Sequence, residues 1–152
     1  MAIKVEKNNL ADLVGTELGT SEWFKLGQIE INQFADVTHD HQFIHTDPEK
    51  AKDTPFGGTI AHGMFVLSLL PKVIEETGIE IIDNKMTMNY GFDKVRFLTP
   101  VIVNSEVRGS TKLTSADEKN PGQYLIKYQI TVEIKGMKKP ALIAEQLALV
   151  LV

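Results

Sequence analysis

The chain has 152 residues and a formal net charge of −4, with 16 basic residues, 20 acidic residues and no cysteine. A chain of this length can bury roughly two-thirds of its unfolded surface, so we expect residues 1–152 to form a single domain. Without cysteine it has no disulfide framework, no thiolate nucleophile and no cysteine-based zinc site.

Lysines and arginines are scattered between acidic residues and form no contiguous basic run, so we expect no nucleic-acid partner. The segment Met1–Lys7 has no apolar core of the kind that secretory signals carry. The most apolar stretches are too short or too interrupted to cross a bilayer. These patterns predict a cytoplasmic protein with no membrane partner.

All four histidines fall between residues 39 and 62, so side chains that exchange protons near neutral pH are confined to one short stretch. Asp40 and His45 would lie roughly 140° apart on a helix and on opposite sides of a strand. They can meet at one reactant only if the chain turns between them, so we expect both in a turn that follows a helix. Asp47-Pro48 predicts a short helix after the turn, because Asp is a good N-cap and Pro fits the first helical position.

A glycine-rich loop at 56–58 leads into an apolar helix predicted over residues 60–70, with Gly63 near its start. Free backbone N–H groups at a helix start can bind an anion or a developing oxyanion. Nearly every side chain of this helix is apolar, so we expect it to be covered on most sides. Pro71 predicts a kink, and Gly78 predicts the end of the helix.

After Gly78 the hydrophobic period becomes two, which predicts long antiparallel strands over 86–97, 103–113, 124–134 and 141–152. The parity changes between Phe92 and Val95, which predicts a bulge near Asp93-Lys94. Turns are predicted at residues 120–122 and 135–137. The last run is apolar on both faces, as in a central strand or a subunit interface. Together the elements predict a sheet wrapped around one buried helix.

Several motifs carry a family resemblance: FADVTHDHQFIHTDPEKA at 34–51, FGGTIAHG at 56–63, NYGFDKVRF at 89–97 and KPA at 139–141. In order and spacing they resemble the MaoC-like dehydratase family of (R)-specific enoyl-CoA hydratases, in the branch named after nodulation protein N. This resemblance implies an α+β hot-dog fold, with an antiparallel sheet wrapped around a long central helix. It also implies a homodimer with its sites at the subunit interface.

The sequence departs from the family pattern beside Asp40. His39 stands where the family usually has Gly, which brings a second imidazole next to Asp40 and costs free energy if the backbone there needs a positive φ. Gln42-Phe43 replaces the common Asn-Pro, as it tends to do in the nodulation-protein branch.

The resemblance implies a hydro-lyase that hydrates trans-2-enoyl thioesters to (R)-3-hydroxyacyl thioesters, or catalyses the reverse dehydration. Asp40 and His45 are the expected catalytic pair on one water, and the Gly63 N–H is expected to bind the thioester oxygen. The residues expected to bind substrate are His62, Phe43, Phe56 and Met64. The substrate would be an acyl-CoA or an acyl-carrier-protein thioester, and the chemistry requires no metal or redox cofactor.

Three alternatives remain open at this level. A hot-dog thioesterase would use a carboxylate to direct water at the carbonyl carbon, and a non-catalytic acyl-binding protein would keep the pocket while His39 disturbs the turn. His41 and His45 also have the i, i+4 spacing of helical metal ligands. The Asp-His pair expected two residues after His41 is Phe43-Ile44 instead, so we expect no metal site.

Overall fold

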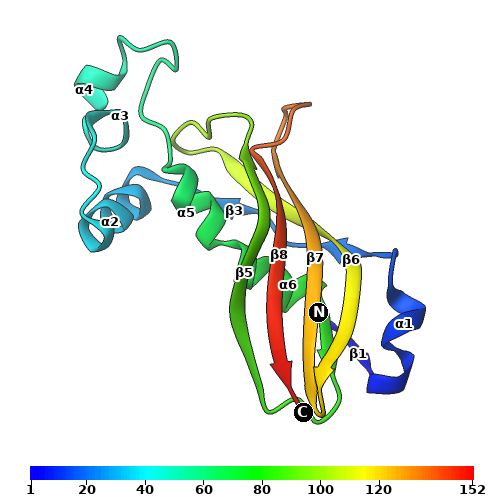
Figure 1. Ribbon diagram of the computed structural model, residues 1–152. Coiled ribbons are helices and arrows are strands. Elements are labelled where there is room, and N and C mark those ends of the chain that lie inside the picture. The colour runs from blue at the N-terminus through cyan, green and yellow to red at the C-terminus, as the bar shows by residue number, and fades with distance from the viewer.

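The computed structural model describes residues 1–152, and its main feature is a curved antiparallel sheet of six strands (Figure 1). The four long strands are β5 (Met86–Phe97), β6 (Glu106–Asn120), β7 (Gln123–Ile134) and β8 (Leu142–Leu151). Two short strands, β2 (Glu17–Thr20) and β3 (Phe24–Lys25), both pair with β6. The order is β2-β6-β7-β8-β5, so the run that is apolar on both faces is a central strand, which was one of its two predicted placements.

The long strands form where the hydrophobic period is two. In β7 every even-numbered residue from Tyr124 to Ile134 is buried, while the residues between them are exposed or half-buried. Both predicted turns beside this strand are confirmed. Gly122 and Gly136 adopt left-handed φ angles of 74° and 79° there, which glycine tolerates without steric cost.

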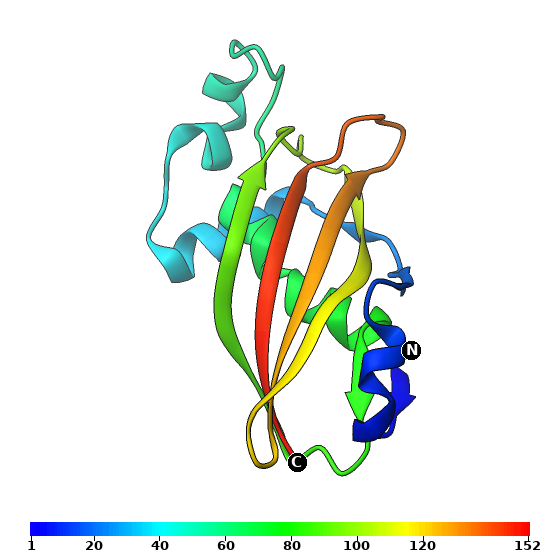
Figure 2. The ribbon, with the colours of Figure 1, turned by 45° about the vertical axis from the view of Figure 1, so that its right-hand side comes forward.

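Two helices, α5 (Gly63–Ser68) and α6 (Leu70–Thr77), lie against one face of the sheet, which curves around them (Figure 2). Pro71 has no N–H to donate to the Leu67 carbonyl. The helix is interrupted at Leu69, whose N–H donates to the carbonyl of Val66, and this interruption confirms the predicted kink. The predicted helix start at residue 60 is wrong, because Ile60 forms a β-bridge with Ile102 instead.

The core lies between this helix pair and the sheet. Val66, Leu70 and Val73 are almost completely buried against the inner faces of β6, β7 and β8. Cover on the other side of α5 is incomplete, since Met64 is 59% exposed. An antiparallel sheet wrapped around a helix is the hot-dog architecture, so the expected α+β fold is confirmed.

Gly78 follows α6, as predicted, but its backbone is extended rather than left-handed. A Cβ at this position would lie 2.7 Å from the carbonyl oxygen of Ile74. Glycine is therefore needed here for a close approach of backbone to backbone.

Strand β5 carries two bulges against β8. The register shifts between Phe92 and Lys94, which confirms the predicted bulge, and also between Asn89 and Gly91, which was not predicted. Residues paired across antiparallel strands lie on the same face. Met88, opposite Leu149, therefore lies on the outer face of the sheet, whereas Phe97, opposite the buried Leu142, lies on the inner face.

The remaining elements lie at the two ends of the sheet. Near one end are η1 (Lys7–Asn9), α1 (Leu10–Leu13) and a parallel pair of short strands, β1 (Ile3–Val5) and β4 (Ile79–Ile81). At the other end, α2 (Gln28–Thr38), α3 (Phe43–Thr46) and α4 (Pro48–Ala51) project beside the start of α5 (Figure 1). No helix in the chain combines the length and apolar character that a membrane crossing requires.

Candidate active site

Asp40 lies in the turn that follows α2. That helix ends at Thr38, and His39 adopts the left-handed conformation with φ 63° and ψ 16°. A non-glycine residue in this region is strained, so His39 takes the backbone shape that glycine adopts freely. The sequence left open whether the backbone at His39 needs a positive φ, and the structure has this positive φ. It directs the chain from α2 toward α3.

His45 lies on the one-turn helix α3 rather than in the turn itself, so this detail of the prediction is wrong. The side chain is buried, and its Nδ1 lies 2.7 Å from the carbonyl oxygen of Ile60. The predicted cap on the next helix is present, since the Asp47 side chain accepts the Lys50 N–H at 3.1 Å and Pro48 begins α4. The turn and two short helices thus hold His45 against the loop before α5.

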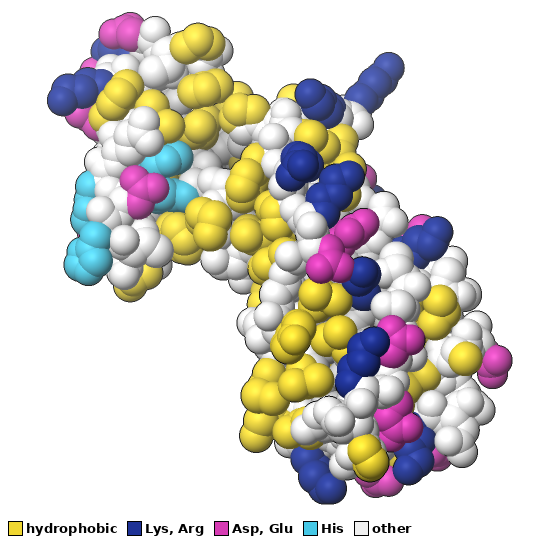
Figure 3. Space-filling view, viewed as in Figure 1, with side chains coloured by type: hydrophobic (Ala, Val, Ile, Leu, Met, Phe, Trp, Pro, Cys, Tyr) yellow, Lys and Arg dark blue, Asp and Glu magenta, His cyan; other side chains and the backbone are white.

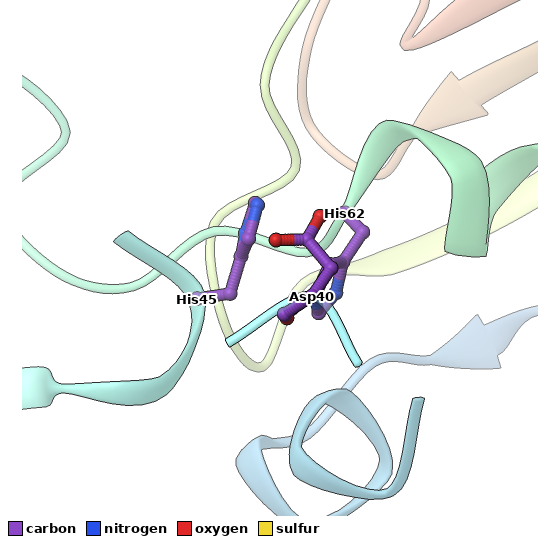
Figure 4. Close-up of side chains that lie close together, drawn as sticks. All are labelled: Asp40, His45 and His62. Atoms are coloured by element: carbon purple, nitrogen blue, oxygen red, sulfur yellow. The ribbon is translucent and has the colours of Figure 1, made fainter. Parts of the chain in front are cut away.

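Three titratable side chains converge between α2, α3 and the start of α5 (Figure 4). One atom each of the Asp40 carboxylate and of the His45 and His62 rings lie within 4.8 Å of one another. The carbonyl of Ile60 can only accept, so Nδ1 of His45 carries a proton and Nε2 is its free nitrogen. Asp40 is exposed, whereas both histidines are buried.

Burial lowers the pKa of His45 below its ordinary value of 6.5, because the imidazolium is poorly solvated there. The hydrogen bond to Ile60 acts in the opposite direction and raises it. Nearby His62 lowers the pKa further, and the Asp40 carboxylate raises it. Since burial is the largest of these influences, His45 is neutral at neutral pH and can accept a proton.

A mainly apolar pocket of about 390 Å³ lies beside this cluster. His45 and Gly63 form part of its wall. The remaining lining residues come from the loop before α5, from α5, from the segment after β5 and from the start of β8: Ile60, Ala61, Val66, Phe97, Leu98, Thr99, Pro100, Val101, Ala141 and Leu142. A pocket of this size and composition can hold an apolar acyl chain.

The backbone N–H of Gly63 is available to a ligand. Gly63 is the first residue of α5, and its N–H donates to no acceptor within the protein. The residue is exposed at the pocket wall, and a Cβ there would lie 3.0 Å from the Phe97 ring. Any larger side chain at position 63 would therefore press on the Phe97 ring, which also lines the pocket.

The other residues expected to bind substrate do not line the pocket. Phe43 is 42% exposed on α3, Met64 is 59% exposed on α5, and Phe56 lies in the loop before α5. His62 is buried behind the pocket wall. Sequence reasoning did not assign the segments 97–101 and 141–142 to the site, although Phe97 and Ala141 end two of the motifs that carry the family resemblance.

The stacking of the two buried histidines disfavours a metal ion between them. The rings of His45 and His62 are stacked with centroids 3.8 Å apart and planes inclined by 25°. Nitrogen lone pairs lie in the plane of the imidazole ring, so two rings stacked in this way are poorly oriented to direct their lone pairs to one ion, although their nitrogens and the Asp40 carboxylate lie within 4.8 Å of one another. His41 points elsewhere, with its Nε2 2.9 Å from the exposed carboxylate of Asp36.

Comparisons with known proteins agree with this architecture. The family model described as "MaoC like domain" matches residues 9–136. Nodulation protein N of Rhizobium meliloti is 44% identical over 148 residues, which are 96% of this chain and 91% of that protein. The 3-hydroxyacyl-thioester dehydratase Z of Mycobacterium tuberculosis is 42% identical over 139 residues, 91% of each chain.

Solved structures give the same picture of the fold. A monoamine oxidase regulatory protein from Archaeoglobus fulgidus superposes with a TM-score of 0.75 at 27% identity, covering 91% of this chain and 90% of that one. The (R)-hydratase from A. caviae superposes with a TM-score of 0.72 at 24% identity, covering 89% of this chain and 94% of that one.

Proposed function

Because the chain belongs to the family of proteins with a MaoC-like domain, we propose that it is a hydro-lyase acting on acyl thioesters. It adds water across a trans-2 double bond, or removes water from an (R)-3-hydroxyacyl thioester. The observation that carries this proposal is the meeting of the Asp40 carboxylate with a neutral, buried His45 beside an apolar pocket. Relatives named 3-hydroxyacyl-thioester dehydratase and (R)-specific enoyl-CoA hydratase support it.

Asp40 and His45 act on a single water molecule. Both the carboxylate and the free Nε2 of His45 can accept a hydrogen bond from water, and the two groups are close enough to share it. One of them takes a proton from the water as its oxygen bonds to the β-carbon. The proton then goes to the α-carbon, so the elements of one water are added and no other reactant is consumed.

The Gly63 N–H binds the thioester oxygen. Attack at the β-carbon moves negative charge onto that oxygen as an enolate forms. A free N–H fixed at the first position of a helix stabilises this charge without reorganising. The acyl chain then extends into the pocket between α5 and the ends of β5 and β8.

The proposed substrate is a thioester of coenzyme A, although a carrier-protein thioester would present the same reacting atoms. The chemistry needs only Asp40, His45 and the Gly63 N–H, without a metal or redox cofactor. We place the reaction in the cytoplasm, where coenzyme A thioesters are made and consumed.

A second copy of the chain completes the molecule as a homodimer. Hydrophobic side chains gather along the free edge of the sheet at β5 (Figure 3). Exposed apolar residues lie on both faces of this edge strand and on α5: Met86 and Met88 on the outer face, Phe92 and Phe97 on the inner face, with Tyr90 of β5 and Met64 of α5. Exposed apolar side chains along a free strand edge are typical of a protein interface, and one of them, Phe97, also lines the pocket.

The test is a hydration assay with crotonyl-CoA and longer trans-2-enoyl-CoA substrates, followed by the ultraviolet absorbance of the conjugated thioester. Release of free thiol is measured in parallel, and each reaction is repeated with a strong chelator present. We expect loss of the conjugated absorbance without thiol release, unaffected by the chelator. Thiol release would indicate a thioesterase instead, and tight binding without turnover would indicate an acyl-binding protein.

A further inference from the structure

His62 connects the three parts of the site, although it does not line the pocket. It is the N-cap of α5 and directly precedes Gly63. The residue is 2% exposed, and its side chain lies beside both Asp40 and His45 (Figure 4). A residue in this position can influence where the Asp40 carboxylate, the His45 imidazole and the free Gly63 N–H lie.

The first connection is a hydrogen bond to the backbone of Asp40. Nε2 of His62 lies 2.9 Å from the Asp40 carbonyl oxygen, across 22 residues of chain. A carbonyl only accepts, so Nε2–H is the donor. This bond links the strained turn after His39 to the start of α5, and it therefore fixes the position of Asp40 relative to the pocket.

The second connection is the stack with His45. The two rings are 3.8 Å apart between centroids and inclined by 25°, so His62 covers one face of the His45 ring. Phe34 of α2 contacts His62 with a centroid distance of 4.9 Å and itself stacks on Phe65 of α5 at 5.0 Å. The His62 imidazole is therefore held by the ring of Phe34 from α2 and the ring of His45 from α3.

His62 also keeps a polar atom that is buried at a cost. Its Nδ1 is buried and has no hydrogen-bond partner. An unpaired buried nitrogen is unfavourable, so a phenylalanine would serve better if packing were the only role. The imidazole supplies something that a hydrocarbon ring does not, and the donor to Asp40 is the evident function.

We propose that His62 is a positioning residue of the hydration site, which holds the Asp40 turn through Nε2–H and fixes the orientation of His45 by stacking. The proposal rests on the proposed function, because it assigns His62 to the reaction of Asp40 and His45. It assigns His62 no contact with substrate and no proton transfer.

The stack has an electrostatic consequence. The titratable groups that face His62 are Asp40 from the turn and His45 from α3, whereas α2 presents the ring of Phe34, which itself stacks on Phe65 of α5. Any positive charge on His62 would repel a proton on His45, and this contact lowers the pKa of His45. Without the imidazole at position 62, the pKa of His45 should rise.

Two variants separate the connections. His62→Phe keeps a ring for the stack but removes the donor, whereas His62→Gln keeps an N–H near the position of Nε2 but removes the ring. His41→Gln is the matched control, because it removes an exposed imidazole from the same turn. For each protein, kcat and KM for crotonyl-CoA hydration are measured against pH, and His45 is titrated by NMR of its ring protons.

We expect His62→Phe to lower kcat roughly ten- to a hundredfold with KM within about twofold, because a misplaced acid slows the reaction more than it weakens binding. His62→Gln should recover part of the lost kcat. In both variants the pKa of His45 and the acid limb of the pH profile should move to higher pH. The control should match the wild type in all of these.

The proposal is overturned if His62→Phe has the kcat of the wild type, if His62→Gln recovers none of the loss, or if His45 titrates identically in all the proteins. An inactive wild type would instead refute the proposed function. In that case the NMR titration alone decides whether His62 acts on His45.

Discussion

Nδ1 of His45 lies 2.7 Å from the carbonyl oxygen of Ile60, and the N–H of Ile60 in turn donates to the carbonyl of Ile44 at 2.9 Å. This reciprocal pair fastens α3 to the loop before α5. The same loop is fastened to the segment after β5, because the Ala61 N–H donates to the Val101 carbonyl at 2.8 Å. His45 is therefore fixed to the pocket wall, with Nε2 as its free nitrogen.

Asp40→Asn and His45→Gln should each lower turnover by roughly two or more orders of magnitude, because each removes a group that holds the shared water or takes its proton. The double variant should be little worse than either single one, since both groups act on one molecule. Steady-state kinetics of the three proteins measure this, with circular dichroism to check the fold. Wild-type turnover in a folded single variant would remove that residue from the mechanism.

Gly63→Pro tests the backbone N–H directly. Proline suits the first position of a helix, and His62 before it has φ −59° and ψ 136°, which a following proline accepts. The change deletes the N–H, so kcat should fall by roughly 10²–10³-fold.

Gly63→Ala is the matched control for the proline variant. Its Cβ meets the same Phe97 ring but leaves the N–H in place. We expect it to keep most of the turnover. Equal losses in the two variants would show that crowding against Phe97, rather than the missing N–H, causes the effect.

His39→Gly should preserve or raise activity and raise the free energy of unfolding by up to about 1 kcal/mol, because glycine adopts the left-handed φ of 63° without strain. His39→Ala removes the same imidazole but keeps the strain, so it separates the two effects. Chemical denaturation and pH–rate profiles provide the measurements. A clear loss of kcat/KM in both variants would show that the His39 side chain contributes to the reaction.

Stability should depend on pH through His45. Its pKa is lowered in the folded protein, chiefly by burial, so below pH 6.5 the unfolded chain binds a proton that the folded chain resists. Keeping the buried ring neutral therefore costs nothing above pH 6.5, and stability is lost as the pH falls from 6.5 through the lower pKa of His45 in the folded protein. Thermal unfolding between about pH 5 and pH 7 should therefore be less pH-dependent in His45→Gln than in the wild type. An unchanged slope would contradict this account.

Tyr90→Lys should convert the proposed dimer into monomers, because Tyr90 is 64% exposed on β5 in the single chain and its replacement costs the fold little. Val14→Lys is the control, since Val14 is also an exposed apolar residue but follows α1, near the other end of the sheet. Sedimentation equilibrium gives the masses. A monomeric wild type would rule out the proposed interface.

The sequence determined the local structure where one short segment contains its own cause. Alternating apolar residues predicted the long strands, the glycines at 122 and 136 marked their turns, and Asp47-Pro48 predicted the cap of α4. The N-terminal strands gave no comparable signal. They are short, and they form only because β6 and β4 offer them partners.

Tertiary structure decided which residues meet. Asp40 and His45 were predicted together because a turn could join them, but the burial of His62 behind His45 depends on how α2 packs on α5. Phe43 and Met64 are as apolar as the pocket residues but lie outside it. The pocket instead uses the ends of β5 and β8, which are far from Asp40 in sequence. Local preferences act over a few residues, whereas the pocket is set by the packing of the whole sheet on its helix.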